Sequence, residues 1–456
     1  MTLYQFFYLI AAFCFIFALK WMSSPASARR GVFIGEFGML LAIVGTLMRA
    51  EVINYEWIIG GLLIGAAIGV PIALLMPMTA VPQRTAISLS CGAFASALIG
   101  AAEYYKPGTH PAFTNAALMV EILLGSLTTT ASLMAFGKLQ EILPGRPIVF
   151  AFQNYFNLAV LAIAAGIGVY NVANPGDTHL FPVYVALAAI FGVLLIIRIG
   201  GADMPTVIAL LNSYSGLSSC AMGFALDNKL LIISGALDGS SGLILSIIMC
   251  RAMNRSFMNV LFGGFGQLQT SSASKEQRPV RSASAEEAAT ILADSRSVVV
   301  IPGYGMAVAQ AQHKIRELHD LLTKRGVDVK FAIHPVAGRM PGHMNVLLAE
   351  ADVPYDKLIE MEDINSDMGM TDVALIIGAN DIVNPAAQND PGSPIAGMPI
   401  LDAYKARTIM IIKRGMSAGF AGIDNELYYM DKTLMLFGDA KSFVASLVKE
   451  IGASHD

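Results

Sequence analysis

The first 260 residues of this chain have few charged side chains. They contain 12 Lys and Arg and 10 Asp and Glu, whereas residues 261–456 contain 18 and 24. This scarcity excludes a single water-soluble core for the whole chain. An excess of basic residues is also missing, because the net charge is −4, so nucleic acid is not an expected partner.

Cysteine is rare as well. None of the four cysteines has a partner at the spacing of a metal site or of a paired-cysteine motif. We therefore expect no metal centre, and the redox compartment stays undecided. All four lie in apolar segments, which predicts small core residues: Cys14, Cys91, Cys220 and Cys250.

Long apolar stretches fill the first part of the chain instead. A helix needs about 20 residues, at 1.5 Å each, to cross a hydrocarbon layer of ~30 Å. Nine stretches meet this length and predict a membrane domain of about nine transmembrane helices over residues 1–260, in contact with lipid. They run near residues 3–20, 31–49, 57–76, 85–104, 115–137, 148–170, 181–199, 205–226 and 229–251.

The basic residues around these stretches predict an orientation. Most lie on the side that also holds the chain after residue 255, and the positive-inside rule makes that side cytoplasmic. The first stretch is expected to stay in place, because no basic region precedes it as in a signal peptide. The richer side holds Lys20, Arg29, Arg30, Arg84, Lys138, Arg146, Arg198, Arg251 and Arg255, and the other side holds Arg49, Lys106 and Lys229.

Several polar residues lie inside the predicted spans. An ionisable group in hydrocarbon costs about 2.5–3.5 kcal/mol, so each must face the bundle interior or water. Glu121, Asn212 and Asp238 are candidates for an ion or proton path, and hydrogen bonding between helices is the alternative. Glycine and serine are dense over residues 200–242, which favours close helix packing.

The rest of the chain divides into a linker and a soluble domain. Residues 261–289 are rich in Ser, Gly and charged residues without periodicity, which predicts a flexible tether. Residues 290–456 alternate apolar runs with amphipathic stretches at 305–325 and 440–452, which predicts a Rossmann-like doubly wound parallel sheet. The expected strands are 297–301, 328–333, 372–377, 407–412 and 433–437.

A glycine turn follows the first of these strands and opens a helix. Gly303 allows a tight turn, Gly305 allows a backbone to approach a pyrophosphate, and Val308 stands where Gly or Ala usually packs against the strand. With Tyr304, Met306 and Ala307 between them, these residues predict a dinucleotide site at a helix N-terminus. A purely structural glycine turn is the alternative.

The basic residues of this domain indicate which nucleotide is bound. No Asp or Glu follows the strand at 328–333 to hold a ribose 2′-hydroxyl, whereas Lys413 and Arg414 follow the strand at 407–412 and suit a 2′-phosphate. The alternative is that Lys413 and Arg414 are ordinary solvated surface charges. Arg339 is a candidate pyrophosphate clamp or a loop-fixing arginine, while His334 and His343 are expected to be structural.

A further loop, at residues 378–381, follows the strand at 372–377. It contains Gly378, Asn380 and Asp381 at the carboxyl end of the sheet, where ligands bind in open α/β folds. The proline-rich segment after it is long for a plain connection and is interpreted as a lid or a docking surface.

Several of these motifs together are similar to those of a known family. The chain resembles the beta subunits of proton-translocating NAD(P) transhydrogenases, over essentially its whole length. The stretches that carry the resemblance are residues 303–312, 334–339, 341–350, 378–381, 385–388, 200–205 and 211–216.

The resemblance implies a site and a reaction. NADP(H) would bind this chain, with Lys413 and Arg414 at the 2′-phosphate, Arg339 near the pyrophosphate and Asp381, the catalytic candidate, near the nicotinamide. The nucleotide would lie reversed on the sheet compared with ordinary Rossmann enzymes. NAD(H) would sit on a separate alpha subunit, made of one chain or two, and hydride would pass directly between the nicotinamides.

The resemblance also implies a coupled membrane complex. Proton translocation would drive the reaction, with Asn212 and Asp203 at positions linked to coupling and Glu121 as a further path candidate. A dimer of alpha–beta units in a prokaryotic inner membrane is expected, active only with the alpha subunit. Many family members have a histidine where this chain has Leu89, so another subunit or a water chain near Asn212 would replace it.

Two other functions compete with this reading. One is a membrane transporter gated by a redox-sensing nucleotide-binding domain, although the spans contain no sequence like a known selectivity filter. The other is an uncoupled, membrane-anchored reductase, for which nine spans with internal carboxylates are more than an anchor requires.

Overall fold

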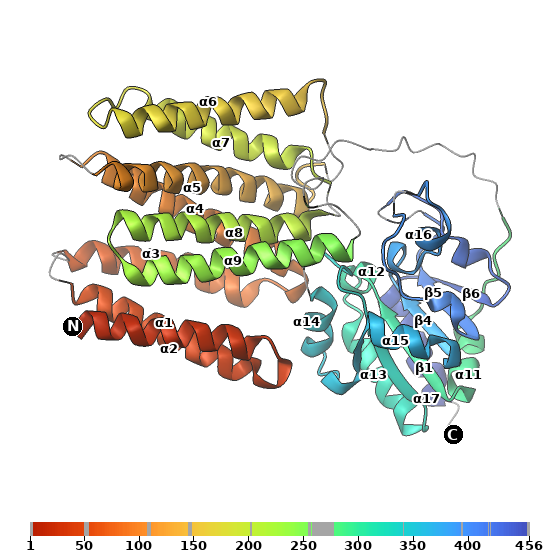
Figure 1. The fold of residues 1–456 in the computed structure, drawn as a ribbon. Helices are drawn as coiled ribbons and strands as arrows, with labels where there is room; N and C mark the ends of the chain where they lie inside the picture. The colour runs from red at the N-terminus through yellow and green to blue at the C-terminus, as the bar shows by residue number, and fades with distance from the viewer. Residues whose placement is uncertain are drawn as a thin grey trace. The chain divides into compact units, whose positions relative to one another are not determined.

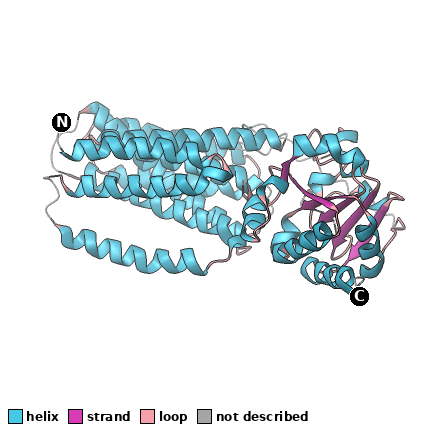
Figure 2. Ribbon diagram, turned by 90° about the horizontal axis from the view of Figure 1, so that it is seen from below, coloured by secondary structure: helices cyan, strands magenta, loops and turns pink. Residues whose placement is uncertain are grey.

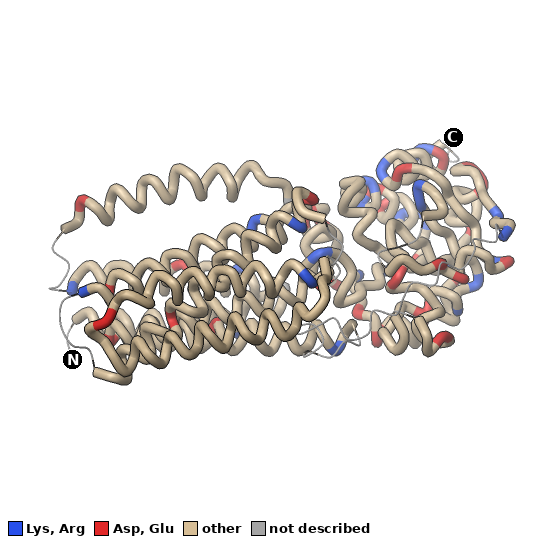
Figure 3. The backbone as a smooth tube through the Cα atoms, turned by 90° about the horizontal axis from the view of Figure 1, so that it is seen from above, with Lys and Arg blue, Asp and Glu red and all other residues tan. Residues whose placement is uncertain are grey.

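The computed structural model describes residues 3–49, 54–106, 111–144, 148–200, 203–253, 257, 278–340, 342–393, 395–417, 419 and 421–453. The chain divides into two compact units. The N-terminal unit comprises residues 1–201 and 206–247, and the C-terminal unit comprises residues 202–205 and 248–456. Charged residues are sparse along the first unit and dense in the second (Figure 3).

The N-terminal unit is built from long apolar helices (Figure 1). Within the described residues, eight of them are long and apolar enough to cross a membrane, whereas α7 has 17 residues and is shorter. Each of the nine predicted spans therefore coincides with a helix. The helices are α1 (Leu3–Met22), α2 (Pro25–Leu47), α3 (Tyr55–Leu75), α4 (Val81–Tyr104), α5 (Ala112–Leu139), α6 (Gln153–Ala173), α7 (Phe181–Ile197), α8 (Met204–Ala225) and α9 (Lys229–Ala252).

The start of α6 differs from the expected position. Residues 148–152 were predicted to begin a span, but the helix begins at Gln153. Phe152, which precedes it, has a left-handed backbone with a φ of 62°. A bulky side chain in that conformation is unfavourable inside a right-handed helix, so the helix cannot extend back through this residue.

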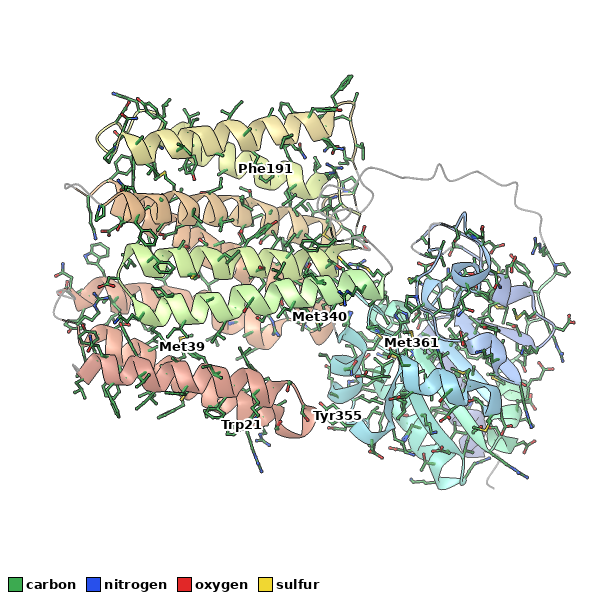
Figure 4. All side chains as sticks on the ribbon, in the orientation of Figure 1. Trp21, Met39, Phe191, Met340, Tyr355 and Met361 are labelled. Atoms are coloured by element: carbon green, nitrogen blue, oxygen red, sulfur yellow. The ribbon has the colours of Figure 1, made fainter. Side chains whose placement is uncertain are left out.

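Burial varies between the helices of this unit. Helix α1 packs along α2, α4 along α5, and α7 against α5 and α6. Helix α3 has no buried residue, and side chains such as Met39 of α2 remain on the outside of the helices (Figure 4). Cys14 and Cys250 are buried as predicted, but Cys91 is exposed, so the core prediction is wrong for Cys91.

Glycines bring the backbones of α8 and α9 together. A Cβ added at Gly216 would lie 2.2 Å from the amide nitrogen of Gly239, and one at Gly235 would lie 2.4 Å from that of Cys220. Any larger side chain would force the helices apart at these points. The expected close packing in the 200–242 region is therefore confirmed.

The C-terminal unit contains a parallel sheet with helices on its faces (Figure 2). Its strand order is β3-β2-β1-β4-β5-β6, and all neighbouring pairs are parallel. This is the doubly wound order, so the predicted fold class is confirmed. The strands are β1 (Ser297–Pro302), β2 (Asp328–Ile333), β3 (Leu358–Glu360), β4 (Val373–Ile377), β5 (Thr408–Lys413) and β6 (Thr433–Phe437).

The helices of this unit differ in part from the prediction. The helix expected at 305–325 is two helices, separated at Gln310, whose φ is 50°. The longer helices α11, α13 and α17 pack together. The helices are α11 (Ala285–Asp294), α12 (Tyr304–Val308), α13 (Gln312–Lys324), α14 (His343–Glu350), α15 (Met361–Asp367), α16 (Ala386–Asn389) and α17 (Ala440–Ala453).

Short 3-10 helices complete the described structure. They lie in the connections between the helices and strands, and the one that matters for the site is η7, between β5 and β6. They are η1 (Met78–Ala80), η3 (Tyr355–Lys357), η4 (Met368–Met370), η5 (Asp381–Val383), η6 (Ala403–Lys405) and η7 (Glu426–Tyr429).

The predicted linker, residues 261–289, is only partly described. Residues 261–277 lie outside the described residues. Residues 285–289 are not a tether but the beginning of α11. Ser284 caps that helix: its hydroxyl accepts a hydrogen bond from the amide of Glu287, whose carboxylate accepts one from the amide of Ser284.

Candidate functional site

The glycine turn after β1 packs directly on the loop after β4. The amide of Gly303 donates to the carbonyl of Ile377 and the amide of Gly305 donates to the carbonyl of Gly378, each over 2.9 Å. A Cβ on Gly303 would lie 2.4 Å from the oxygen of Gly378, and one on Gly305 would lie 2.7 Å from its Cα. These glycines therefore let two loops meet at the carboxyl edge of the sheet.

The helix that follows the turn is shorter than expected. Helix α12 spans only Tyr304–Val308. Within this helix Met306 and Ala307 are buried, whereas the side chain of Val308 is 51% exposed. The packing role predicted for Val308 is therefore wrong, since Met306 and Ala307 make the contact with the core.

A second group of residues gathers beside this turn. The guanidinium of Arg339 lies 4.3 Å from the centre of the Tyr304 ring. The amide of Arg339 donates to Nδ1 of His343 over 3.0 Å. Gly338, with a φ of 112°, leaves room for the His343 ring, because a Cβ there would lie 2.5 Å from Nδ1. The loop thus places Arg339 next to the predicted phosphate-binding turn.

The two histidines around this loop are buried and neutral. Burial lowers the pKa of His334 to about 4, and burial together with the nearby charge of Arg339 lowers the pKa of His343 to about 4. Nε2 of His334 lies 2.8 Å from the carbonyl of Pro399 and Nδ1 accepts from the amide of Val336. Among the described residues, no cluster of His, Cys, Asp and Glu suits a metal ion.

A third group forms where β4 and β5 end. Lys413 lies over the Tyr428 ring, 4.6 Å from its centre, and its Nζ donates to the Tyr428 hydroxyl over 3.2 Å. Nζ also contacts the carbonyl of Ser417. The Tyr428 hydroxyl donates to Oδ1 of Asn380 over 2.6 Å. The end of β5 is therefore tied to the loop after β4.

The neighbouring carboxylate is held by the backbone of the next loop. The amide of Ala421 donates to Oδ2 of Asp381 over 3.0 Å. A Cβ on Gly419 would lie 2.5 Å from Oδ1 of Asp381, so only glycine fits at that distance. Burial lowers the pKa of Lys413, and the charges of Asp381 and Asp424 partly oppose this change.

The predicted basic pair is divided between two environments. Lys413 is half-buried within the group just described, whereas Arg414 is exposed and makes no hydrogen bond with the described residues. Lys413 is thus fixed in place and Arg414 projects into solvent. An anion at this edge of the sheet would meet both.

Sequence reasoning missed part of this arrangement. Tyr428 and Asn425 contact Asn380, and neither follows a strand or a glycine-rich turn. Tyr428 belongs to the short η7 segment and Asn425 caps it, and this segment has no periodicity. Only the clustering of polar and aromatic residues at 424–429 is visible in the sequence.

The polar residues that are candidates for an ion or proton path lie on and around α8. The side-chain amide of Asn212 donates to Oδ1 of Asp238 on α9 over 2.9 Å. Further along α8, Ser218 donates to the main-chain oxygen of Glu121 on α5 and shares a 2.8 Å hydrogen bond with Ser96 on α4. Asp203 comes directly before α8.

The spacing along α8 orders these polar sites. At 1.5 Å per residue, Asn212 and Ser218 are roughly 9 Å apart along the helix. Glu121 itself is 0% exposed and lies against α4, where a Cβ on Gly100 would approach its Oε1 at 3.1 Å. Leu89 is on α4, and Ser90 beside it donates to the carbonyl of Thr129 over 3.0 Å.

Known proteins are similar in sequence to this chain over both of its units. A family model described as NAD(P) transhydrogenase beta subunit matches residues 4–450. A Rhodospirillum rubrum protein named NAD(P) transhydrogenase subunit beta is 48% identical over 453 residues, which cover 97% of each chain. A protein of the same name from a specified strain of that species shows the same identity and coverage. The chain therefore belongs to the NAD(P) transhydrogenase beta subunit family.

Proposed function

We propose that this chain binds NADP(H) in its C-terminal unit and exchanges hydride directly with NAD(H) on an alpha subunit. Membership in the beta subunit family supports the reaction and the partner. In this assignment residues 1–260 are the membrane domain, and the nucleotide domain, expected over 290–456, also includes residues 281–283 beside β6 and the start of α11. The enzyme is active only with its alpha partner and couples the reaction to proton translocation.

The residues at the carboxyl edge of the sheet suit NADP(H). Lys413 and Arg414 would hold the 2′-phosphate, and Arg339 would hold the pyrophosphate near Gly303, Tyr304, Gly305, Met306, Ala307 and Val308. The contact of the Arg339 guanidinium with the Tyr304 ring supports this fit, because it keeps a cation beside the turn. Asn380 and Asp381 would lie at the nicotinamide end and orient it for hydride transfer.

Coupling is assigned to the polar groups along α8. Asn212 and Asp238 form one site, and Glu121 lies near Ser218 at another. With Asp203 at the start of the helix, these groups would carry protons between the two sides of the membrane. We place the C-terminal unit in the cytoplasm of a prokaryote and the complex, a dimer of alpha–beta units, in the inner membrane.

The position of Lys413 carries the choice of nucleotide. Tyr428 holds the Lys413 ammonium group at the end of β5, and Arg414 beside it is exposed. The fixed ammonium group of Lys413 next to the exposed guanidinium of Arg414 suits the 2′-phosphate, which NADP(H) has and NAD(H) lacks. The test is to measure the dissociation constants of NADPH and NADH for the full chain without its alpha partner.

We expect Lys413→Ala with Arg414→Ala to weaken NADPH at least tenfold, since each charge-assisted hydrogen bond contributes about 1.5–3 kcal/mol. NADH binding should not change. Lys405→Ala, which removes a lysine paired with Asp402 in the same unit, is the control. Equal affinity of the unmutated chain, without its alpha partner, for the two nucleotides would exclude the proposal.

A further inference from the structure

Arg278 and residues 281–283, which come just before α11, lie beside Tyr429 and along β6. We propose that Arg278 is a positioning residue for NADP(H): through Tyr429 and Asp424 it holds the group of Asn425, Asn380 and Lys413 in place. The inference rests on the proposed function of that site. It adds a residue from outside the sheet to the groups that shape the site.

The first observation is that residues 281–283 are attached to β6. Ser282 forms a parallel bridge with Met435. The amide of Met435 donates to the carbonyl of Arg281 over 2.7 Å, and the amide of Ala283 donates to the carbonyl of Met435 over 3.1 Å. The segment is thus fixed to an edge strand just before α11, and Arg278 lies three residues ahead of it.

The second observation is the contact made by Arg278. Its guanidinium lies over the Tyr429 ring, 5.5 Å from the centre. The Tyr429 hydroxyl donates to Oδ2 of Asp424 over 2.8 Å. A cation over an aromatic face is attractive, so Arg278 restrains the ring that holds Asp424.

The third observation is what Asp424 holds in turn. Its Oδ1 accepts from the amide of Asn425 over 2.9 Å, and its carbonyl accepts from the side-chain amide of Asn384 over 2.9 Å. Asn425 donates to Asn380, which also accepts from Tyr428, the partner of Lys413. Contacts therefore run without a break from Arg278 through Tyr429, Asp424, Asn425, Asn380 and Tyr428 to Lys413.

The exposure of Arg278 allows an experiment to distinguish a positioning role from a structural role. Its side chain is exposed, so its removal leaves no cavity and no buried polar group. A loss of NADP(H) affinity on its substitution would therefore report on the site, because the fold does not depend on this side chain.

The test uses the complete complex in vesicles and measures the dissociation constant of NADPH together with the KM for NADP⁺ and for NADH. We expect Arg278→Gln to raise the NADPH dissociation constant and the NADP⁺ KM about two- to fivefold, the usual size for an exposed cation–π contact. The KM for NADH should stay the same. Arg278→Lys keeps a cation and should restore most of the affinity.

Two further variants make the result decisive. Arg281→Gln removes the same charge three residues away, from a side chain with no contact among the described residues, and should have no effect. Arg278→Gln should add nothing to Tyr429→Leu, because both act through one contact. Equal NADPH affinity in Arg278→Gln, Arg281→Gln and the unmutated complex would overturn the inference. An unmutated chain that does not prefer NADPH to NADH in the absence of its alpha partner would overturn the proposed function itself.

Discussion

The side-chain amide of Asn425 donates to both the main-chain oxygen and the Oδ1 of Asn380, over 3.1 Å in each case. Asn425 is fully buried, so water cannot replace these bonds without local opening. The loop after β4 therefore keeps its shape only while η7 remains in place. Asp381, the next residue of that loop, depends on the same support.

Asn425→Ala tests this dependence. It removes the buried side-chain donor from the main-chain oxygen of Asn380, while Oδ1 of Asn380 keeps its bond from Tyr428, and the loss of a buried hydrogen bond costs about 1–3 kcal/mol. We expect a lower midpoint of thermal unfolding for the C-terminal unit and weaker NADPH binding. Asn389→Ala, at an exposed asparagine on α16, is the control, and equal effects of the two variants would contradict the argument.

Gly378→Ala tests the contact between the two loops. A Cβ at Gly378 would lie 2.4 Å from the Cα of Gly305, at a φ of 65°. Gly326 has a φ of 84° but open space around it, so Gly326→Ala has the backbone strain without the clash. We expect Gly326→Ala to cost roughly 1–2 kcal/mol of stability and Gly378→Ala a further 1–3 kcal/mol.

The measurement for this pair is chemical unfolding with and without NADPH. Stabilisation by NADPH should persist in Gly326→Ala and be lost in Gly378→Ala. If both variants are stabilised equally by the nucleotide, the loop contact is not part of the binding site.

Asn212→Ala tests the polar pair on α8 and α9. Hydrogen bonds between membrane helices contribute only about 0.6 kcal/mol to stability on average, so the helices should stay packed in this variant. We expect proton uptake during NADPH formation in vesicles to fall because Asp238 loses its hydrogen-bond donor, with NADPH binding unchanged. Ser215→Ala on the same helix is the control. Unchanged proton uptake in Asn212→Ala would remove Asn212 from the path.

The two buried histidines predict a loss of stability in weak acid. Burial lowers the pKa of both to about 4, against about 6.5 in an unfolded chain. Between these values the unfolded state binds more protons, so the free energy of unfolding falls as the pH drops from 6.5 to 4, by up to about 1.4 kcal/mol per pH unit for each histidine. Above pH 6.5 they contribute no pH dependence.

Hydrogen exchange of the C-terminal unit against pH is the measurement. His334→Gln and His343→Gln should each flatten the acid side of the stability curve, while His313→Gln, at an exposed position, should not. An unchanged curve in both buried variants would mean that other groups cause the acid sensitivity.

The apolar runs predicted five of the six strands because each of those strands is buried on both faces. Strand β3 was missed, since it has three residues and none of them is buried. The break at Gln310 was also missed: its left-handed backbone is set by packing of the turn, and the amphipathic pattern continues across it. The local hydrophobic pattern therefore predicts the sheet, but not its short edge strand or the ends of the helices.

The candidate site was also predicted only in part. Residues that directly follow strands, such as Lys413 and Asn380, were placed at the correct edge because parallel strands end together. Tyr428 and Asn425 reach that edge from a 3-10 turn, through hydrogen bonds that depend on tertiary structure. No spacing rule connects them to their partners in the sequence.

The outer strands of the sheet bear on how this protein behaves at high concentration. A free strand edge is a template for aggregation with another chain. Strand β6 is partly covered by the backbone of residues 281–283, and β3 at the opposite edge has only three residues. Within the described residues, the sheet offers little unpaired backbone for another molecule, so this domain is protected against strand-to-strand association even when many copies are crowded together.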